Sequence, residues 1–161
     1  MLRFASNKPD TTMNVRQLVD AIAALDEKDA LQCRLGHEGW KLLAPYLALH
    51  FLQAGTVLIN EGDSDRTLFI LAEGELKVQS RGHDIARLKP GTVVGEGAFF
   101  SGEPRSATIS SVAHGIAWSL TWAKFEAMSA QYPKLALDLT KGLAAVLAVR
   151  MREAILVGQF V

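Results

Sequence analysis

The sequence has little of what several classes of protein require: it contains one cysteine, four histidines and no surplus of either charge. Cys33 is alone and cannot form a disulfide within the chain. Lys+Arg and Asp+Glu number 17 each, so the formal net charge is zero and no long-range field attracts nucleic acid or an anionic membrane. The chain also starts without a basic segment followed by an apolar one. These absences favour a cytoplasmic protein with no DNA partner.

Long apolar runs and catalytic constellations are missing as well. The run 143–149 is far too short to span a bilayer, so membrane insertion is not expected. A metal-dependent barrel enzyme needs paired histidines and a carboxylate on neighbouring strands, whereas the histidines here are scattered. No serine lies in a nucleophile elbow, and Cys33 has no evident activating partner. We therefore expect neither a metal site nor an enzyme. The scattered histidines are His37, His50, His83 and His114.

The length of 161 residues and the apolar fraction of 49% suit one domain with appended helices. Residues 1–13 are polar and are expected to form a flexible leader. Apolar residues at helical spacing follow from Val15 to Leu25, with Asn14 as N-cap. Further helices are predicted at about 28–35 and 38–49, the last one bent at Pro45. Segment 14–49 is thus predicted to be helical.

Between residues 50 and 121 the pattern changes to short β-rich pieces separated by glycine and small polar residues. Close spacing of short strands with glycine turns is typical of a jelly roll or barrel. The predicted fold class is therefore α+β, a β-jelly-roll barrel flanked by N-terminal helices and a long C-terminal helix. The predicted strands are 57–60, 68–71, 75–79, 85–88, 107–112 and 116–120.

Helical pattern returns in segment 122–161. A helix over 122–130 stops at Tyr132-Pro133, and a long helix covers 134 to about 157, with the proline in its first turn. This last helix carries an apolar stripe from Leu135 to Leu147 and small residues elsewhere around its axis. A helix this apolar is expected to pack on its own domain and also on a partner.

Residues 95–108 hold the most informative stretch, GEGAFFSGEPRSAT. Room for a single helical turn lies between Ala98 and Ser101, and the start of such a turn presents free N–H groups to an anion. Arg105 adds a fork of donors that matches a phosphate. Glu96 repels a phosphate and is better suited to accept a hydrogen bond from a hydroxyl. A ligand with both a phosphate and a ribose hydroxyl is a nucleotide.

This stretch resembles the phosphate-binding cassette of the cyclic nucleotide-binding domain family, and the glycine-punctuated runs 54–63 and 68–78 resemble the strands before it. The resemblance spans about residues 42–152. It implies that Glu96 meets the ribose 2′-hydroxyl, that Arg105 meets the cyclic phosphate and that amides near Ala98 and Ala107 bind the remaining oxygens. It also implies that Arg150, on the lid or dimer helix, reaches the base. The candidate ligand-binding residues are Gly95, Glu96, Gly97, Ala98, Arg105, Ser106, Ala107, Thr108 and Arg150.

One residue departs from the family pattern, which usually has a large aliphatic residue where this chain has Gly97. An aliphatic side chain at position 97 is expected to pack into the barrel and to fill a volume that Phe99 and Phe100 could fill instead.

The resemblance favours a cyclic AMP sensor that moves its C-terminal helix and controls a protein partner, with a homodimer through that helix as a further option. Cyclic GMP, a cyclic dinucleotide, or a scaffold with a degenerate pocket are the alternatives, as is a plain surface ion pair between Glu96 and Arg105.

Overall fold

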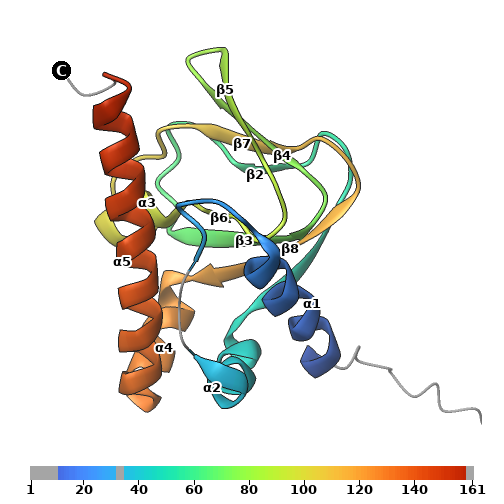
Figure 1. Cartoon of the computed structure of the whole chain (residues 1–161), viewed down its shortest axis with the longest axis vertical. Helices are drawn as coiled ribbons and strands as arrows, with labels where there is room; N and C mark the ends of the chain where they lie inside the picture. The colour runs from blue at the N-terminus through green and yellow to red at the C-terminus, as the bar shows by residue number, and fades with distance from the viewer. Residues whose placement is uncertain (1–10, 32–34, 159–161) are drawn as a thin grey trace, which may run out of the picture.

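A computed structural model describes residues 11–31 and 35–158 of the chain, with side chains from residue 15 onward. Two antiparallel β-sheets form its centre, and helices lie at both ends of this part of the chain (Figure 1). The helical elements are α1 (Thr11–Ala24), α2 (Gly36–Leu43), the 3-10 helix η1 (Ala44–Tyr46), α3 (Glu96–Ser101), α4 (Trp122–Gln131) and α5 (Pro133–Leu156). The strands are β1 (Ala48–Leu52), β2 (Val57–Ile59), β3 (Thr67–Glu73), β4 (Leu76–Ser80), β5 (His83–Leu88), β6 (Val93–Val94), β7 (Thr108–Ser111) and β8 (Gly115–Thr121).

The strands pair in the orders β1-β8-β3-β6 and β2-β7-β4-β5, and every pairing is antiparallel. Strands distant in sequence are neighbours, as where Ile70 of β3 lies opposite Trp118 of β8. This arrangement of two sheets with crossing connections confirms the predicted jelly roll.

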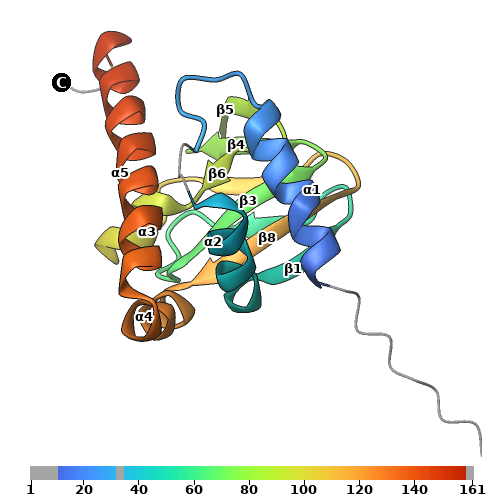
Figure 2. The same cartoon turned by 60° about the horizontal axis from the view of Figure 1, so that its bottom comes forward.

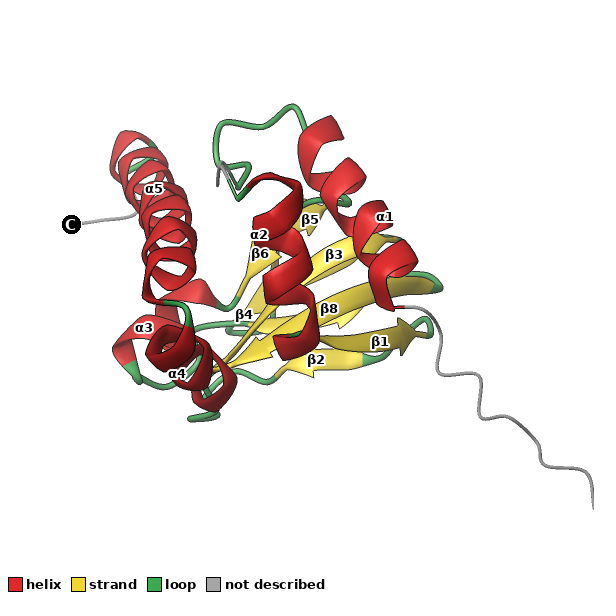
Figure 3. Ribbon diagram, turned by 90° about the horizontal axis from the view of Figure 1, so that it is seen from below, coloured by secondary structure: helices red, strands yellow, loops and turns green. Residues whose placement is uncertain are grey.

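Strand β3 shows why the two sheets and the helices form one body. Side chains alternate between the two faces of a strand, and both faces of β3 are buried. Phe69 and Leu71 join an apolar cluster between the two sheets, to which seven of the strands contribute. Leu68 and Ile70 point the other way, into a cluster shared with α1, α2, α4 and α5. The sheet that contains β3 is therefore covered on its outer face by helices, as Figure 3 shows for α1 and α2.

Helix α5 runs along one side of the molecule (Figure 2). The predicted apolar stripe does face the domain: Leu135, Leu139, Leu143 and Val146 are buried. No residue of α5 beyond Val146 is buried, although the helix continues for ten more residues to Leu156. The part of α5 beyond Val146 therefore adds no fully buried apolar side chain to the core.

Several predicted boundaries were wrong near the N-terminus. Helix α1 begins at Thr11, so Asn14 lies within the helix rather than at its N-cap. The helix predicted over 28–35 is not present at residues 28–31, which form a turn and a loop, and residues 32–34 with Cys33 lie outside the described residues. The helix predicted over 38–49 ends at Leu43 and passes through a 3-10 turn containing Pro45. Strand β1 then begins at Ala48, two residues before the predicted start of the β-roll.

Candidate functional site

Glycines at both ends shape the short helix α3 of the cassette. Gly95 precedes α3 with φ of 81°, and Gly102 follows it with φ of 72°, both in the left-handed region that favours glycine. A Cβ atom at Gly95 would lie 2.7 Å from Nη1 of Arg105 and 2.9 Å from the carbonyl oxygen of Thr67. Glycine at position 95 therefore lets the backbone approach Arg105 closely enough to bond with it.

Arg105 is a buried cation, with its side chain only 2% exposed. Its Nε and Nη2 donate to the two carboxylate oxygens of Asp65, at 3.2 and 2.7 Å. Nη1 donates to the carbonyl of Gly95 at 2.9 Å, and Nη2 also donates to the carbonyl of Thr67. These bonds join α3, β3 and the loop before β3 around one guanidinium, so Arg105 supports the fold as well as facing the cassette.

Asp65 is a residue that the sequence analysis did not single out. Hydrogen bonding to Arg105 holds the pKa of this carboxyl below its usual range, even though partial burial opposes the shift. The acidic turn Asp63-Ser64-Asp65 offers two candidates, and only the fold shows that Asp65 is the one that reaches the arginine. Asp63 instead uses its backbone carbonyl, which accepts from the amide of Arg105 at 2.7 Å.

Glu96 starts α3 and is also buried, with its side chain 10% exposed. It does not pair with Arg105, so the alternative of a surface ion pair between these two residues is wrong. Its Oε1 accepts from Nη1 of Arg150 on α5 at 2.6 Å. Glu96 and Arg105 are thus neutralised by separate partners. Glu96 pairs with an arginine on α5, and Arg105 pairs with an aspartate in the loop before β3.

Arg150 makes two further contacts. Its Nε donates to Oδ2 of Asp29 at 2.8 Å, and its Nη2 donates to the carbonyl of Val93 at 2.7 Å. Burial by itself would lower the pKa of Arg150, but the carboxylates of Glu96 and Asp29 outweigh burial and raise that pKa. Arg150 is therefore a fixed charge at the junction of α5, α3 and the segment after α1.

The other predicted site residues lie around α3. Gly97 is exposed, and a Cβ atom there would meet nothing within 4 Å. The expectation that a side chain at position 97 packs into the barrel is therefore wrong, and Phe99 refills no such volume. Phe99 is instead fully buried against Phe100, Trp122 and Phe125. Ala98 is half-buried in the same helix.

The end of the cassette is held by contacts with the β4–β5 hairpin and with the segment that follows β2. Ser106 is exposed, and its carbonyl accepts from the hydroxyl of Ser80 at 3.0 Å. The hydroxyl of Thr108 at the start of β7 accepts from the amide of Glu61 at 3.0 Å, which leaves its O–H free to donate. Ala107 is half-buried between them.

Arg66 is a second residue that the sequence analysis missed. Its Nε and Nη2 donate to the carbonyls of Phe99 and Phe100, at 2.9 and 3.0 Å, which satisfies the C-terminal end of α3. Its guanidinium also lies 3.8 Å from the ring centroid of Trp122. Arg66 follows the exposed acidic turn directly in the sequence, and nothing in that local pattern predicts that it caps α3.

The described residues also bear on metal binding and on membrane insertion. Within residues 11–31 and 35–158 no group of three metal-ligating side chains comes together. In the same part of the chain, no helix has the length and apolar character needed to cross a membrane.

Comparison with known proteins agrees with this geometry. The family model of the cyclic nucleotide-binding domain matches residues 49–132. Over 101 residues the chain is 34% identical to the Pycsar effector protein XpPycTIR of Xanthomonas perforans, a match covering 62% of this chain and 32% of that protein. It is 33% identical over 88 residues to a cyclic nucleotide-gated potassium channel of Rhizobium etli, covering 55% of this chain and 24% of the channel. The chain thus spans about a third or less of the length of these relatives.

The fold has a close counterpart among solved structures. A cyclic nucleotide-binding domain from Methylobacillus flagellatus superposes with a TM-score of 0.78 at 21% identity, over 89% of this chain and 82% of that one. With its jelly roll, its cassette and a family match over more than half its length, this chain belongs to the cyclic nucleotide-binding domain family.

Proposed function

We propose that this protein binds a cyclic mononucleotide at α3 and responds by moving α5. The observation that carries the proposal is the pair of buried, oppositely charged side chains that the cassette presents, Glu96 at the start of α3 and Arg105 just after it. In this proposal Glu96 accepts from the ribose 2′-hydroxyl, and Arg105 faces the cyclic phosphate. The amides of Gly97 and Ala98 at the start of α3, with those near Ala107, bind the other phosphate oxygens.

The bonding of Arg105 sets how the phosphate is held. A guanidinium has five N–H donors, and the bonds to Asp65, Gly95 and Thr67 use four of them. One N–H on Nη1 is left for the ligand. The phosphate therefore depends on this single charged donor together with the backbone amides, which makes the exact position of α3 decisive for affinity.

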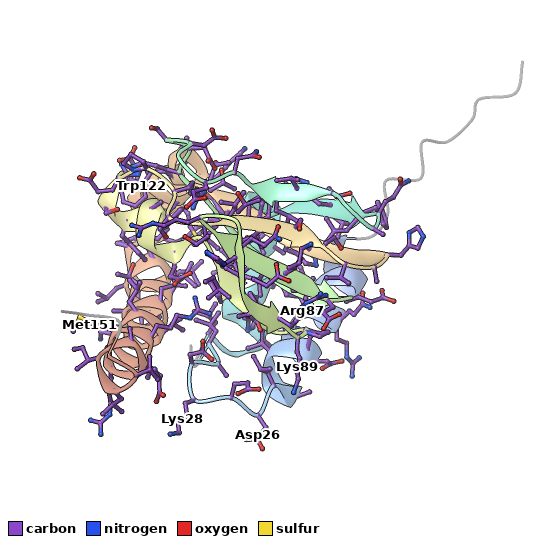
Figure 4. All side chains as sticks on the ribbon, turned by 90° about the horizontal axis from the view of Figure 1, so that it is seen from above. Asp26, Lys28, Arg87, Lys89, Trp122 and Met151 are labelled. Carbon is purple, nitrogen blue, oxygen red and sulfur yellow. The ribbon has the colours of Figure 1, made fainter. Side chains whose placement is uncertain are left out.

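We take cyclic AMP as the first candidate, as the family resemblance implies, and cyclic GMP as the second. A cyclic dinucleotide is less well supported because its second phosphate needs another free cation. Arg150 is already held by two carboxylates. Arg87 and Lys89, labelled in Figure 4, form exposed and therefore weak pairs with Glu75 at 3.8 Å and Glu27 at 3.7 Å, so a second phosphate would have to compete with these two carboxylates.

We also propose that the site binds without turnover, in the cytoplasm. The two buried ionisable groups of the cassette are engaged: Glu96 neutralises Arg150, and Arg105 is neutralised by Asp65. Neither is available as a free base or nucleophile.

We propose that α5 passes the binding signal on by contacting a protein partner. A second copy of this chain is one such partner. Its outward face carries exposed residues spaced four and three apart, and Met151 points away from the barrel (Figure 4). Such spacing is that of a helix–helix seam. The exposed residues are Leu137, Lys141, Ala144, Ala148, Met151 and Ile155. Sedimentation of the wild type and of Leu137→Glu would detect a dimer through this face, and equal masses for both would reject it.

Calorimetric titration tests the binding proposal. Purified, nucleotide-free protein is titrated with cyclic AMP, cyclic GMP and 5′-AMP, and the same is done with Arg105→Lys and with Arg152→Ala. Arg152 is exposed on α5 and serves as the matched control. We expect micromolar or tighter binding of one cyclic nucleotide, weakened about tenfold or more by Arg105→Lys because lysine lacks the fork, and unchanged by Arg152→Ala. Absence of heat with all three ligands would favour the scaffold alternative.

A further inference from the structure

The segment after α1 touches the proposed nucleotide site through one side chain, Asp29. Asp29 lies in the turn at residues 28–29, in the loop that leaves α1 and runs toward α5 (Figure 2). Its Oδ2 accepts from Nε of Arg150 at 2.8 Å, while Nη1 of the same guanidinium donates to Glu96 at 2.6 Å. One arginine is thus shared between the cassette and the N-terminal helical segment.

The contact between this segment and α5 is polar. An open pocket of about 450 Å³ lies between this segment and the last turns of α5, with Lys28 and Asp29 among the residues that line it. Lys28 pairs with Glu153 at 3.7 Å, but both side chains are largely exposed, and such a pair contributes little. No residue of α5 beyond Val146 is buried. Among the described residues, the Asp29–Arg150 pair is therefore the main link between the part of α5 beyond Val146 and the segment after α1.

The ion pair between Asp29 and Arg150 is partly buried and restrains the orientation of the Arg150 guanidinium. The Asp29 side chain is 32% exposed and that of Arg150 27%, so the pair is partly shielded from solvent. Bonds from Nε to Asp29, from Nη1 to Glu96 and from Nη2 to the carbonyl of Val93 fix the plane of the guanidinium on three sides. Loss of the Nε bond would leave the guanidinium held only through Nη1 and Nη2 and would change how it presents Nη1 to Glu96.

We propose that Asp29 is a positioning residue of the nucleotide site, which acts on the ligand through Arg150 and Glu96. The proposal rests on the proposed function, in which Glu96 meets the ribose 2′-hydroxyl. Asp29 orients Arg150, Arg150 orients the Glu96 carboxylate, and Glu96 accepts a hydrogen bond from the ribose 2′-hydroxyl. Because coupling between two sites is reciprocal, nucleotide binding also changes the conformation of the loop between α1 and α2 through the same contacts.

The test measures how strongly the protein distinguishes cyclic AMP from 2′-deoxy cyclic AMP. If the calorimetric titration shows that cyclic GMP is the ligand, the corresponding guanosine pair is used. We expect Asp29→Asn to reduce the ratio of the two affinities about three- to tenfold, a range typical of coupled contacts. Asp29→Glu should restore part of the ratio. Asp26→Asn, an exposed acid of the same loop with no ion pair to another described residue, should leave the ratio unchanged. In an Arg150→Ala background, Asp29→Asn should have no further effect.

The outcomes separate this inference from the function on which it rests. A merely structural role for Asp29 would weaken binding of both ligands equally and leave their ratio intact, and that result would overturn the proposal while cyclic nucleotide binding stood. A wild type that binds neither ligand would overturn both. If thermal melts show that Asp29→Asn does not fold, Arg150→Lys gives the same test, since lysine keeps the charge on α5 but cannot bond to Asp29 and Glu96 in one plane.

Discussion

Replacing Asp65 by asparagine tests whether the cassette depends on a charge partner that lies outside it. The substitution keeps the shape of the side chain but removes the charge and one acceptor facing Arg105, whose side chain is 2% exposed. Breaking a fully buried ion pair costs about 3–5 kcal/mol. The Asp65 side chain is 45% exposed and partly screened by solvent, so we expect a smaller loss of about 1–2 kcal/mol in the free energy of unfolding.

Urea unfolding at pH 7, followed by tryptophan fluorescence, measures this loss. Asp63→Asn is the matched control, because Asp63 is exposed in the same turn and uses only its backbone in the described contacts. The control should change stability by no more than about 0.5 kcal/mol. Equal stabilities of the two variants would show that the Asp65 carboxylate does not stabilise the fold through Arg105.

The pH dependence of the same difference checks its electrostatic origin. The folded-state pKa of Asp65 lies below the ordinary value of 3.8. The carboxylate therefore contributes its stability in full above about pH 4 and loses that contribution as the pH falls through the folded pKa. Wild type and Asp65→Asn should converge in stability on acidification. A gap that stayed constant down to the acid limit of folding would show that the ionised carboxylate is not its source.

Three further substitutions probe the helix of the cassette. Gly95→Ala should cost about 2 kcal/mol or more in the free energy of unfolding and displace Arg105, because the new Cβ meets Nη1 at 2.7 Å and the φ of 81° is unfavourable; near-wild-type urea unfolding would contradict this. Gly97→Ala should be neutral or raise stability by up to about 1 kcal/mol, because the position is open and helical; a clear loss in the same assay would show that position 97 packs after all. Arg66→Lys should cost about 1–2 kcal/mol and speed hydrogen exchange of the amides of α3, since lysine cannot bond to both carbonyls while stacking on Trp122; unchanged exchange would count against the capping role.

Patterns of apolar residues and glycines were enough to predict the jelly roll and the long last helix. The strands of the roll are short β-rich runs between glycine turns, and the apolar residues of α5 recur at helical spacing, so the local signal and the tertiary packing agree. Strand β1 escaped prediction because it follows Pro45 in a segment whose leucines and alanines also suit a helix. Only pairing with β8, Ala48 opposite Ser119 and onward, makes this segment extended.

The sequence pattern points to Glu96 and Arg105 as candidate site residues, but it does not indicate which side chains hold them. The spacing predicts Glu96 before a short helical turn and Arg105 after it, whereas in the structure Glu96 is the first residue of α3 and Arg105 follows the end of that helix. The partner of Arg105, Asp65, lies 40 residues away in sequence, and the partner of Glu96, Arg150, lies 54 residues away. Asp29 is 121 residues from Arg150, and nothing local marks it among the acids of its loop. Contacts of this kind depend on how separate elements meet, which no local pattern encodes.

The central claim is that a cyclic mononucleotide binds at α3, and an NMR titration of nitrogen-15-labelled protein with cyclic AMP, and then with cyclic GMP, tests it most directly. We expect saturable shifts centred on the amides of residues 96–98 and 106–108, together with the Nε signals of Arg105 and Arg150. A spectrum unchanged by both nucleotides would contradict the account. So would shifts confined to residues remote from α3, such as the exposed outer face of α5.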